Sequence, residues 1–452
     1  MQVDLTKVFV CDIISTIGAI YMLKRKIEQV LLDWKNTKGK KNCLLIKGAR
    51  QVGKTYIVER FAESNYQSFI HMNFDKNESL KDIFEGDLDV DTLRKQITLN
   101  MPSARLIDGD TLIFLDEIQQ CPRARTALKF FAIDGRYDVI ASGSLLGVNY
   151  KKVPSYPTGY EDEITMHSLD FEEYLWANGY SEEAIAGLKG YFDTGKKVPE
   201  AIHNKMLSFL REYIVIGGMP AVVDEFVKTS DFNLALRTQR SILRNYENDI
   251  AKYAETKDRV KARACYLSLP RQLAKENTKF QYSVVERNGA ARKFESSIDW
   301  LLNAGMVLVC DNISTPQPPL KTFVKAGYFK LYSHDIGLLA AMLEDGAQKN
   351  IIDDKLGLGK GAIYENLVAS MLVRRGKELF YYADGDRLEI DFVVRINDEV
   401  TGVEVKAKKG QATSLKTAMA ENQGLKGIKL TSGNIGAAEG IQTYPLYMAM
   451  FL

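Results

Sequence analysis

Short apolar runs alternate with amphipathic stretches along the N-terminal part of the chain. The runs are rich in Ile, Leu, Val and Phe, which is typical of strands buried in a sheet. The stretches between them repeat apolar residues three and four positions apart, the period of a helix that packs on one face. This alternation predicts an α/β fold in which helices flank a parallel sheet. We expect strands at 44–46, 68–74, 112–115, 137–144 and 161–169, and helices at 24–34, 55–62 and 171–178.

The first expected strand runs into a glycine-punctuated loop, and a helix follows. Gly48 and Gly53 bracket four residues, and Lys54 and Thr55 come next. Backbone N–H groups of such a loop turn towards a phosphate chain, and the following helix points its positive end at it. Lys54 would reach the β- and γ-phosphates, and the Thr55 hydroxyl would ligate Mg²⁺. The strand and helix around the motif argue against a chance match.

Two later strands end in residues that suit the same chemistry. Asp116 would hold Mg²⁺ through water, and Glu117 would polarise the attacking water. Ser142 and Ser144 would lie near the γ-phosphate and sense it by hydrogen bonds, although a turn or helix cap explains them equally well. The predicted nucleotide-binding residues are Gly48, Ala49, Arg50, Gln51, Val52, Gly53, Lys54, Thr55 and Asp116. The predicted catalytic residues are Lys54, Glu117, Ser142 and Ser144, and the arginines considered for transition-state stabilisation are Arg123, Arg125 and Arg136.

Composition limits the classes of function. The chain has 452 residues, 46% of them hydrophobic, which is enough for more than one domain. Lys and Arg number 60 and Asp and Glu 58, so the net charge of +2 gives no global basic field for nucleic acid, and any such binding is local. The five scattered cysteines fit reduced thiols of a cytoplasmic protein, and the four histidines form no metal motif.

The N-terminal stretch lacks the features of a targeting or membrane segment. Residues 8–23 are apolar, but they include Asp12, are too short to span a bilayer and lack a basic n-region. We therefore expect no membrane contact. The amphipathic helix at 24–34 marks the start of the first domain, and we expect residues 1–21 to be an extension outside the fold.

The middle of the chain predicts a helix, a turn, a second helix and a strand. The helices are expected at 269–275 and 293–303, and the strand at 306–310. This is the order of a winged helix, and Arg287, Arg292 and Lys293 would suit contact with DNA phosphates. A solvated basic helix end is the alternative for these residues.

The C-terminal part predicts a β-hairpin. Strands at 390–396 and 399–406 flank a two-residue turn, Asn397-Asp398. That turn places Asp391 opposite Glu404, with Lys406 on the same face as Glu404. Two facing carboxylates repel each other unless a cation lies between them.

Several motifs resemble those of a known family. GARQVGKT, IFLDE, ASGSLLG and LDFEEYL, together with later stretches at 213–220 and 244–249, resemble the AAA-type P-loop ATPases of bacteria and archaea that carry a C-terminal domain of unknown function. The resemblance extends from about residue 22 to the C-terminus. It implies ATP and Mg²⁺ as cofactors, and domains at 22–200 (ATPase), 206–345 (helical and winged-helix) and 350–452 (a small α/β, nuclease-like domain).

The C-terminal acids resemble a second group. Asp391 and the Glu404-x-Lys406 motif, with Glu365 on an expected helix at 363–373, resemble the PD-(D/E)XK nuclease superfamily. The resemblance implies that Glu365, Asp391 and Glu404 hold Mg²⁺ or Mn²⁺ and that Lys406 helps to activate water. We expect an ATPase coupled to a DNA-binding or nuclease-like module. The alternative is a regulatory switch or scaffold whose nuclease-like domain is inactive and binds a protein partner or a second copy of the chain.

Overall fold

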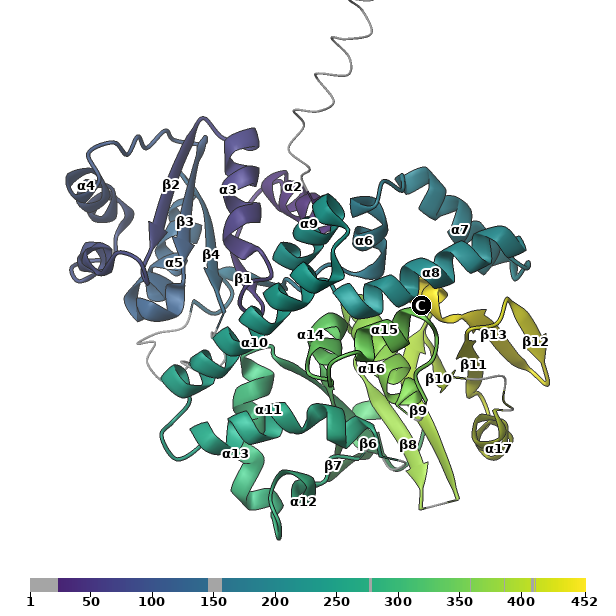
Figure 1. Cartoon of the computed structure of the whole chain (residues 1–452). Coiled ribbons are helices and arrows are strands. Elements are labelled where there is room, and N and C mark those ends of the chain that lie inside the picture. The colour runs from purple at the N-terminus through teal and green to yellow at the C-terminus, as the bar shows by residue number, and fades with distance from the viewer. Residues whose placement is uncertain are drawn as a thin grey trace, which may run out of the picture.

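Two sheets joined by a layer of helices make up the computed structural model (Figure 1). It describes residues 23–144, 157–275, 279–357, 359–385, 387–407, 410 and 412–452. The expected extension at 1–21 and residues 145–147 of the ASGSLLG motif lie outside these residues. In the described part of the chain, no helix has the length and apolar character needed to cross a bilayer.

The N-terminal sheet is parallel and covered on both faces, which confirms the predicted α/β fold. Alternate residues of β1, which lies between β4 and β5, face opposite sides of the sheet, so that Leu44 and Ile46 pack with α3 (Lys54–Asn65) and Leu45 packs with α5 (Pro122–Asp134). The phosphate-binding loop thus leaves a strand that is buried on both faces. The strands are β1 Cys43–Lys47, β2 Ser68–Asn73, β3 Thr111–Asp116, β4 Asp138–Gly143 and β5 Glu161–Thr165, in the order β2-β3-β4-β1-β5.

Helices α2 (Ile27–Lys35) and α4 (Val90–Asn100) complete this part. The sequence pattern predicts one apolar face of α2, formed by Ile27, Val30, Leu31 and Trp34. Leu31 and Trp34 are buried, which agrees with the pattern, but Val30 is 43% exposed. The helix packs along the line from Ile27 through Leu31 to Trp34, and Val30 lies at the edge of that stripe.

The second part is helical and ends in two strands. Three helices, α11, α12 and α13, precede the antiparallel pair β6 and β7, which agrees with the element order expected of a winged helix. The winged-helix assignment itself stays a prediction. The elements are α6 Phe171–Ala177, α7 Glu182–Thr194, α8 Glu200–Ile216, α9 Pro220–Thr229, α10 Phe232–Tyr253, α11 Arg259–Leu273, α12 Tyr282–Val285, α13 Ala291–Asn303, β6 Val307–Ile313 and β7 Val324–Ser333.

The C-terminal sheet has eight strands and crosses the expected domain boundary at 345–350. Strand β6 pairs in parallel with β8, so β6 and β7 belong to the same sheet as the last six strands. Helices α16 and α17 pack on opposite faces of this sheet. The remaining elements are α14 Ile336–Ala341, α15 Ala347–Ile352, α16 Lys360–Arg374, α17 Thr413–Glu421, β8 Phe380–Asp384, β9 Leu388–Ile396, β10 Glu399–Lys406, β11 Lys426–Thr431, β12 Gly436–Ala438 and β13 Ile441–Pro445.

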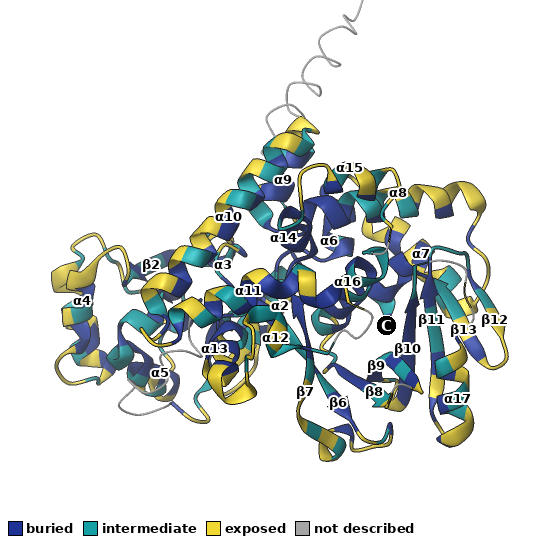
Figure 2. Ribbon diagram, turned by 60° about the horizontal axis from the view of Figure 1, so that its bottom comes forward, coloured by how far each residue is buried: buried dark blue, intermediate teal, exposed yellow. Residues whose placement is uncertain are grey.

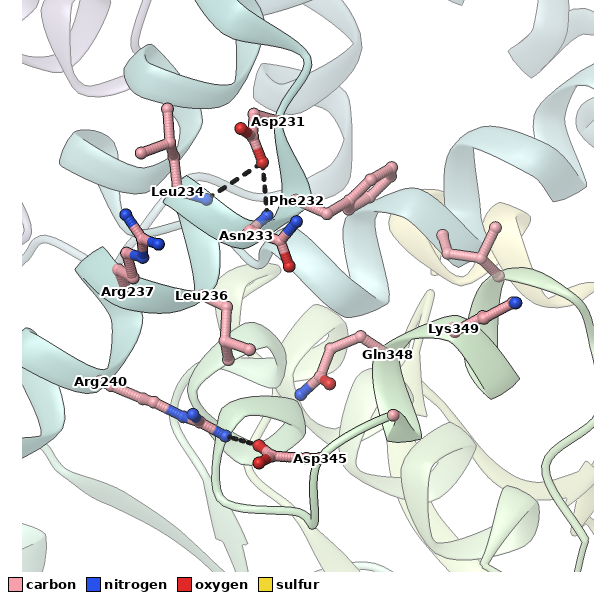
Figure 3. A pocket seen from close by; sticks show the side chains of 12 residues that line it. Asp231, Phe232, Asn233, Leu234, Leu236, Arg237, Arg240, Asp345, Gln348 and Lys349 are labelled. Carbon is pink, nitrogen blue, oxygen red and sulfur yellow. Dashed lines mark hydrogen bonds and ion pairs between the residues drawn. The ribbon is translucent and has the colours of Figure 1, made fainter.

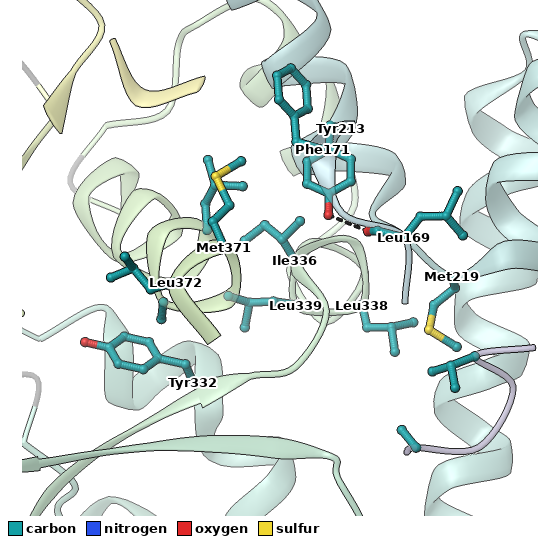
Figure 4. Close-up of a cluster of buried hydrophobic side chains, with 14 of the residues drawn as sticks. Leu169, Phe171, Tyr213, Met219, Tyr332, Ile336, Leu338, Leu339, Met371 and Leu372 are labelled. Carbon is teal, nitrogen blue, oxygen red and sulfur yellow. Dashed lines mark hydrogen bonds between the residues drawn. The ribbon is translucent and has the colours of Figure 1, made fainter. Parts of the chain in front are cut away.

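Helix α14 lies where the parts of the chain meet. All of its residues are buried, and it is dark blue in Figure 2. Figure 4 shows Ile336 and Leu339 of this helix between Phe171 on one side and Met371 and Leu372 of α16 on the other. These residues belong to one continuous apolar core that also includes β1 and α3. The N-terminal sheet and the C-terminal sheet therefore share a core.

Candidate nucleotide-binding site and C-terminal acid cluster

The phosphate-binding loop is held from three sides. A Cβ atom on Gly48 would lie 2.1 Å from a backbone oxygen of the segment that follows β5, so this position requires glycine. On the N-terminal side, the guanidinium of Arg25 donates to the carbonyl oxygen of Val52 at 3.1 Å. From α10, the hydroxyl of Tyr246 donates to the carbonyl oxygen of Arg50 at 2.9 Å. Contacts outside the motif thus fix the conformation of the loop.

Lys54 begins α3, and its ammonium group is almost completely buried. Its Nζ atom donates to the carbonyl oxygens of Gly48 and Ala49 at 2.9 and 2.8 Å, and the residue is 6% exposed. Burial lowers the pKa of Lys54 to about 8, although the neighbouring carboxylates of Glu117 and Asp116 act in the opposite direction. A buried cation beside the backbone amides of a glycine loop is well placed to bind an anion.

Asp116, at the end of β3, collects hydrogen bonds from several elements. Thr55 donates to its carboxylate at 3.0 Å, Asn73 donates at 2.7 Å, and Ser142 also donates. Nε2 of His71 lies 3.4 Å away. Burial raises the pKa of Asp116, but the hydrogen bonds, that of His71 first, outweigh it and hold the pKa below its ordinary value. Asp116 is therefore an ionised carboxylate beside the Thr55 hydroxyl, as the predicted Mg²⁺ pair requires.

Glu117 has an unusual backbone conformation. Its φ of 55° and ψ of 45° lie in the left-handed region, which residues other than glycine rarely adopt. Ser144 donates to its carboxylate at 3.1 Å, and Gln119 donates to the same oxygen. Strain of this kind is typical of functional sites, where the surrounding structure enforces it. The structure thus brings Ser142 to Asp116 and Ser144 to Glu117, a pairing that sequence reasoning did not foresee.

The three arginines considered for transition-state stabilisation contact other parts of the chain. Arg123 donates to backbone carbonyls of residues 84 and 86. Arg125 is buried and paired with two glutamates of β5, and Arg136 is paired with two aspartates. All three are absent from the lining of the cavity at the phosphate-binding loop.

That cavity has a volume of about 700 Å³ and opens between the loop and helices α9 and α10. Sequence reasoning predicted only the loop side of it. The polar residues on α10 are spaced at i, i+3 and i+4, which places them on one face of the helix. This spacing was the sequence signal from which the helical side of the cavity could have been predicted. The loop side includes Arg50, Gln51, Gly53, Lys54, Thr55 and Glu117, and the helical side consists of Pro220, Ala221, Asn245, Asn248 and Asp249.

An apolar recess of about 320 Å³ adjoins this cavity. The two share Gly53, Tyr56, Pro220 and Ala221, so they form neighbouring parts of one depression. A third cavity, of about 640 Å³, lies between the start of α10 and α15 and shares no lining residue with the first two (Figure 3). Across it, Arg240 of α10 pairs with Asp345.

The C-terminal hairpin has the predicted register. Both residues of its turn, 397 and 398, have positive φ, and the strand residues on either side of the turn pair as expected. The pairing extends to Val403 with Phe392, one residue short of Glu404 and Asp391. The Asp391 carboxylate accepts from the N–H of Val405 at 2.7 Å, and the charge of Glu404 acts on Asp391, so the two predicted acids lie near each other.

Two lysines lie among these acids. Lys406 lies 2.5 Å from a carboxylate oxygen of Glu404. Lys330 of β7, which is 0% exposed, lies 2.5 Å from Glu389 and 3.7 Å from Glu365. The sequence predicted Lys406 as a member of this cluster but not Lys330 or Glu389. The local pattern of β7 does not indicate which strands will lie next to it in the sheet.

The acids retain strong mutual electrostatic effects. Burial and then the charges of Glu365 and Glu404 raise the pKa of Asp391 well above its ordinary value. Burial also raises the pKa of Glu404, although Lys406 opposes this. Oε2 of Glu404 is buried without a hydrogen-bond partner in the described part of the chain. Among the described residues, no three His, Cys, Asp or Glu side chains converge to hold a metal ion, so the metal site stays a prediction.

The basic residues of the expected winged helix lie on the surface. Arg287 and Arg292 are exposed, before and at the start of α13. Lys293 is exposed as well and pairs with Glu286 at 2.5 Å. The structure therefore places all three within reach of a ligand in solvent.

Three family models match successive parts of the chain. Residues 40–175 match the AAA domain, and residues 208–349 and 360–446 match two domains of unknown function, DUF8612 and DUF4143. An uncharacterised protein of Haemophilus influenzae is 24% identical over 402 residues, which cover 83% of this chain and 84% of that protein.

Solved structures with low similarity were also found. A Walker-type ATPase of Pyrococcus abyssi is 12% identical with a TM-score of 0.42, over 71% of this chain and 96% of that one. The Orc1 protein of Aeropyrum pernix, solved in complex with DNA, is 13% identical with a TM-score of 0.25, over 73% and 91%. The family match, together with the glycine loop and the parallel sheet flanked by helices, shows that residues 40–175 have the fold of a P-loop NTPase and are similar to the AAA domain.

Proposed function

We propose that this protein binds ATP with Mg²⁺ and hydrolyses it. The observation that carries the proposal is that motif residues following two different strands, β1 and β3, meet at one cavity. Lys54, Thr55 and Glu117 line the cavity, and Asp116 is hydrogen-bonded to Thr55. The match of this region to the AAA domain supports the same conclusion.

The two adjoining depressions suit the two ends of ATP. The backbone N–H groups of residues 48–55 and the ammonium of Lys54 would bind the phosphates. The recess beside them is lined mainly by apolar side chains, which suit the faces of an adenine ring, and Arg25, Asp224 and Lys228 also line it. Its apolar lining consists of Leu23, Ile57, Met166, Pro220 and Ala221.

The residues present also fit Mg²⁺. The Thr55 hydroxyl and the ionised Asp116 carboxylate are hard oxygen ligands, which this ion prefers. When bound, the ion would neutralise charge on the phosphates. Glu117 would accept a proton from the attacking water, and Ser144 would orient the Glu117 carboxylate for that role. Ser142 would position Asp116 in the same way.

The first prediction concerns the two charged residues at the reacting end. Lys54→Ala should abolish nucleotide binding, because backbone amides alone do not replace the ammonium on the phosphates. Glu117→Gln should still bind ATP but hydrolyse it at least ~100-fold more slowly, because the amide cannot accept a proton. Steady-state phosphate release and equilibrium binding of ATP measure both. Unchanged hydrolysis in both variants would rule out the ATPase proposal.

The second prediction is a pH dependence of ATP affinity. Lys54 must be protonated to bind phosphates, and its pKa of about 8 means that the neutral form accumulates above that pH. Bound phosphates raise the pKa, so the complex holds a proton that the free protein has lost. The association constant should therefore fall about tenfold per pH unit above pH 8.

Isothermal titration calorimetry at about pH 7, 8 and 9, with Mg²⁺ in excess, measures this slope. Lys54→Arg is the matched control, because arginine stays charged throughout and any affinity that it retains should not follow the wild-type slope. A flat wild-type profile would contradict the effect assigned to burial of the Lys54 ammonium.

We propose further that the C-terminal half acts on DNA. Three exposed cations lie before and at the start of α13, where a winged helix would meet the phosphate backbone. We place this activity in the cytoplasm, which agrees with the buried free thiols at Cys43, Cys121, Cys265 and Cys310.

The third prediction tests this surface. Replacing Arg287, Arg292 and Lys293 by alanine should weaken binding uniformly across DNA sequences and reduce the slope of log K against log salt by about three. Fluorescence anisotropy on two unrelated duplexes, over a salt series, measures both effects. Lys189, Lys196 and Lys197, exposed in and after α7, give a control triple alanine variant with the same loss of charge. Equal weakening in both triple variants would show that net charge alone is responsible.

The acid cluster supports a divalent metal in a nuclease-like module. The carboxylates of Glu365, Glu389, Asp391 and Glu404 pair with or act electrostatically on only two lysines, Lys330 and Lys406. The two negative charges that these lysines leave unbalanced correspond to one divalent cation or two bound protons. The buried Oε2 atom of Glu404, which no described residue satisfies, favours a ligand at this point.

The alternative is an inactive domain that binds a protein partner. The observation that favours it is Lys330, a fully buried cation already paired with Glu389 inside the cluster. In that case protons supply the missing charge, and the cluster serves the structure.

The fourth prediction separates the two. In a Lys54→Ala background without nucleotide, excess Mn²⁺ should raise the melting temperature, because the folded state alone binds the metal. Asp391→Asn should lose this shift together with any Mn²⁺-dependent cleavage of DNA. Glu399→Gln, an exposed change at the other end of β10, should retain both. If Asp391→Asn and Glu404→Gln both keep the shift, the metal binds elsewhere and the inactive domain is the better description.

A further inference from the structure

Arg50 links the phosphate-binding loop to helix α10. Its guanidinium pairs with the carboxylate of Asp249, and it also lies 3.6 Å from Asp75 and 5.8 Å from the ring of Tyr253. The motif that defines the loop requires only its two glycines, Lys54 and Thr55. The charge of Arg50 is therefore a feature of this chain that the general phosphate-binding role does not explain.

Asp249 depends on that arginine. The residue is 5% exposed, and its Oδ2 atom is buried without a hydrogen-bond partner in the described part of the chain. Burial raises the pKa of Asp249, and the positive charge of Arg50 opposes this. Because a buried carboxylate without a cation is costly, the Arg50–Asp249 pair holds α10 against the loop.

The same guanidinium lies where the end of a triphosphate would reach. Arg50, Asp249, Lys54 and Glu117 all line one cavity. A terminal phosphate has more charge than a carboxylate and offers three acceptor oxygens to the fork of an arginine. The γ-phosphate and Asp249 would thus compete for one cation, whereas a diphosphate ends short of it.

We propose that Arg50 distinguishes ATP from ADP by exchanging Asp249 for the γ-phosphate. This inference rests on the proposed ATPase function and assigns to Arg50 the selectivity for the triphosphate. Arg50 is also suited to the role because Arg123, Arg125 and Arg136 are engaged elsewhere. With ADP, the Arg50–Asp249 pair persists and α10 stays held. With ATP, Asp249 loses its partner, so α10 is no longer tied to the loop by this pair.

The path beyond α10 leads into the C-terminal half. Tyr246, one turn before Asp249, donates to the carbonyl oxygen of Arg50 and lies 3.3 Å from Nε2 of His334. His334 lies between β7 and α14, and its Nδ1 atom lies 3.1 Å from the carbonyl oxygen of Met306 before β6. Side-chain contacts thus connect the backbone of Arg50 to the segments that precede β6 and follow β7.

The test compares the affinities of a slowly hydrolysed ATP analogue, ATPγS, and ADP by calorimetry in Mg²⁺. Arg50→Ala should weaken ATPγS binding about 10- to 100-fold, the loss of a charge-assisted contact, and leave ADP within about twofold. Asp249→Asn should have the opposite effect on the affinity for ATPγS and increase it, because the substitution removes the carboxylate that competes for Arg50. Arg50→Gln and Asp249→Asn change the side-chain volume less than Arg50→Ala does. They therefore still give the two nucleotide affinities if Arg50→Ala folds poorly.

The pair Arg240–Asp345, on the same helix but across a separate cavity (Figure 3), supplies the control. Arg240→Ala and Asp345→Asn should leave both affinities unchanged. Equal losses for ATPγS and ADP in Arg50→Ala and Arg50→Gln, or no gain in Asp249→Asn, would overturn the inference while leaving the ATPase proposal in place. Wild-type protein that binds neither nucleotide would overturn both.

Discussion

One buried carboxylate, that of Asp335, joins the parts of the chain. It accepts from Ser168 after the N-terminal sheet at 2.7 Å and from the N–H of Gly218 between α8 and α9 at 2.8 Å. It also caps α14 through the N–H of Leu338, and Arg374 of α16 lies 3.9 Å away. A buried charge must keep its partners, so separation of any of these elements would leave this carboxylate unsatisfied. The arrangement of the N-terminal and C-terminal sheets depends on this network.

Close backbone contact around this carboxylate explains the two glycines of the 213–220 stretch, for which the sequence alone indicates no role. A Cβ atom on Gly218 would lie 1.9 Å from the carbonyl oxygen of Leu169, and one on Gly337 would lie 2.4 Å from that of Ile216. The glycine pair at 217–218 therefore lets α8, α14 and the segment before α6 approach each other. The consequence extends to the nucleotide site, because α9 begins at Pro220, which lines both the phosphate cavity and the apolar recess.

Features encoded by neighbouring residues were predictable, and those that depend on distant pairing were not. The phosphate-binding loop and the β9–β10 register follow from local spacing, since glycines and a two-residue turn fix the backbone directly. Lys330 and Asp249 were missed because their positions depend on which strand lies beside β7 and on how α10 packs. The shared sheet was missed for the same reason, because the pairing of β6 with β8 joins residues far apart in the chain. Val30 was predicted to lie on the buried face of α2 but is 43% exposed, because the elements that pack against a helix decide how far its buried face extends.

The two charged sites of this protein share one physical property. At the loop, a buried ammonium is stabilised by carbonyl oxygens and has a lowered pKa, and in the C-terminal sheet buried carboxylates outnumber their lysines and have raised pKa values. Burial of the Lys54 ammonium shifts its pKa despite the nearby carboxylates of Asp116 and Glu117, and in the C-terminal sheet two lysines balance the buried carboxylates only in part. Both arrangements cost folding free energy, and perturbed groups of this kind are concentrated at functional sites. In the proposed function an anion binds at the first site and a cation at the second, so the packing around Asp335 would connect two sites of opposite preference.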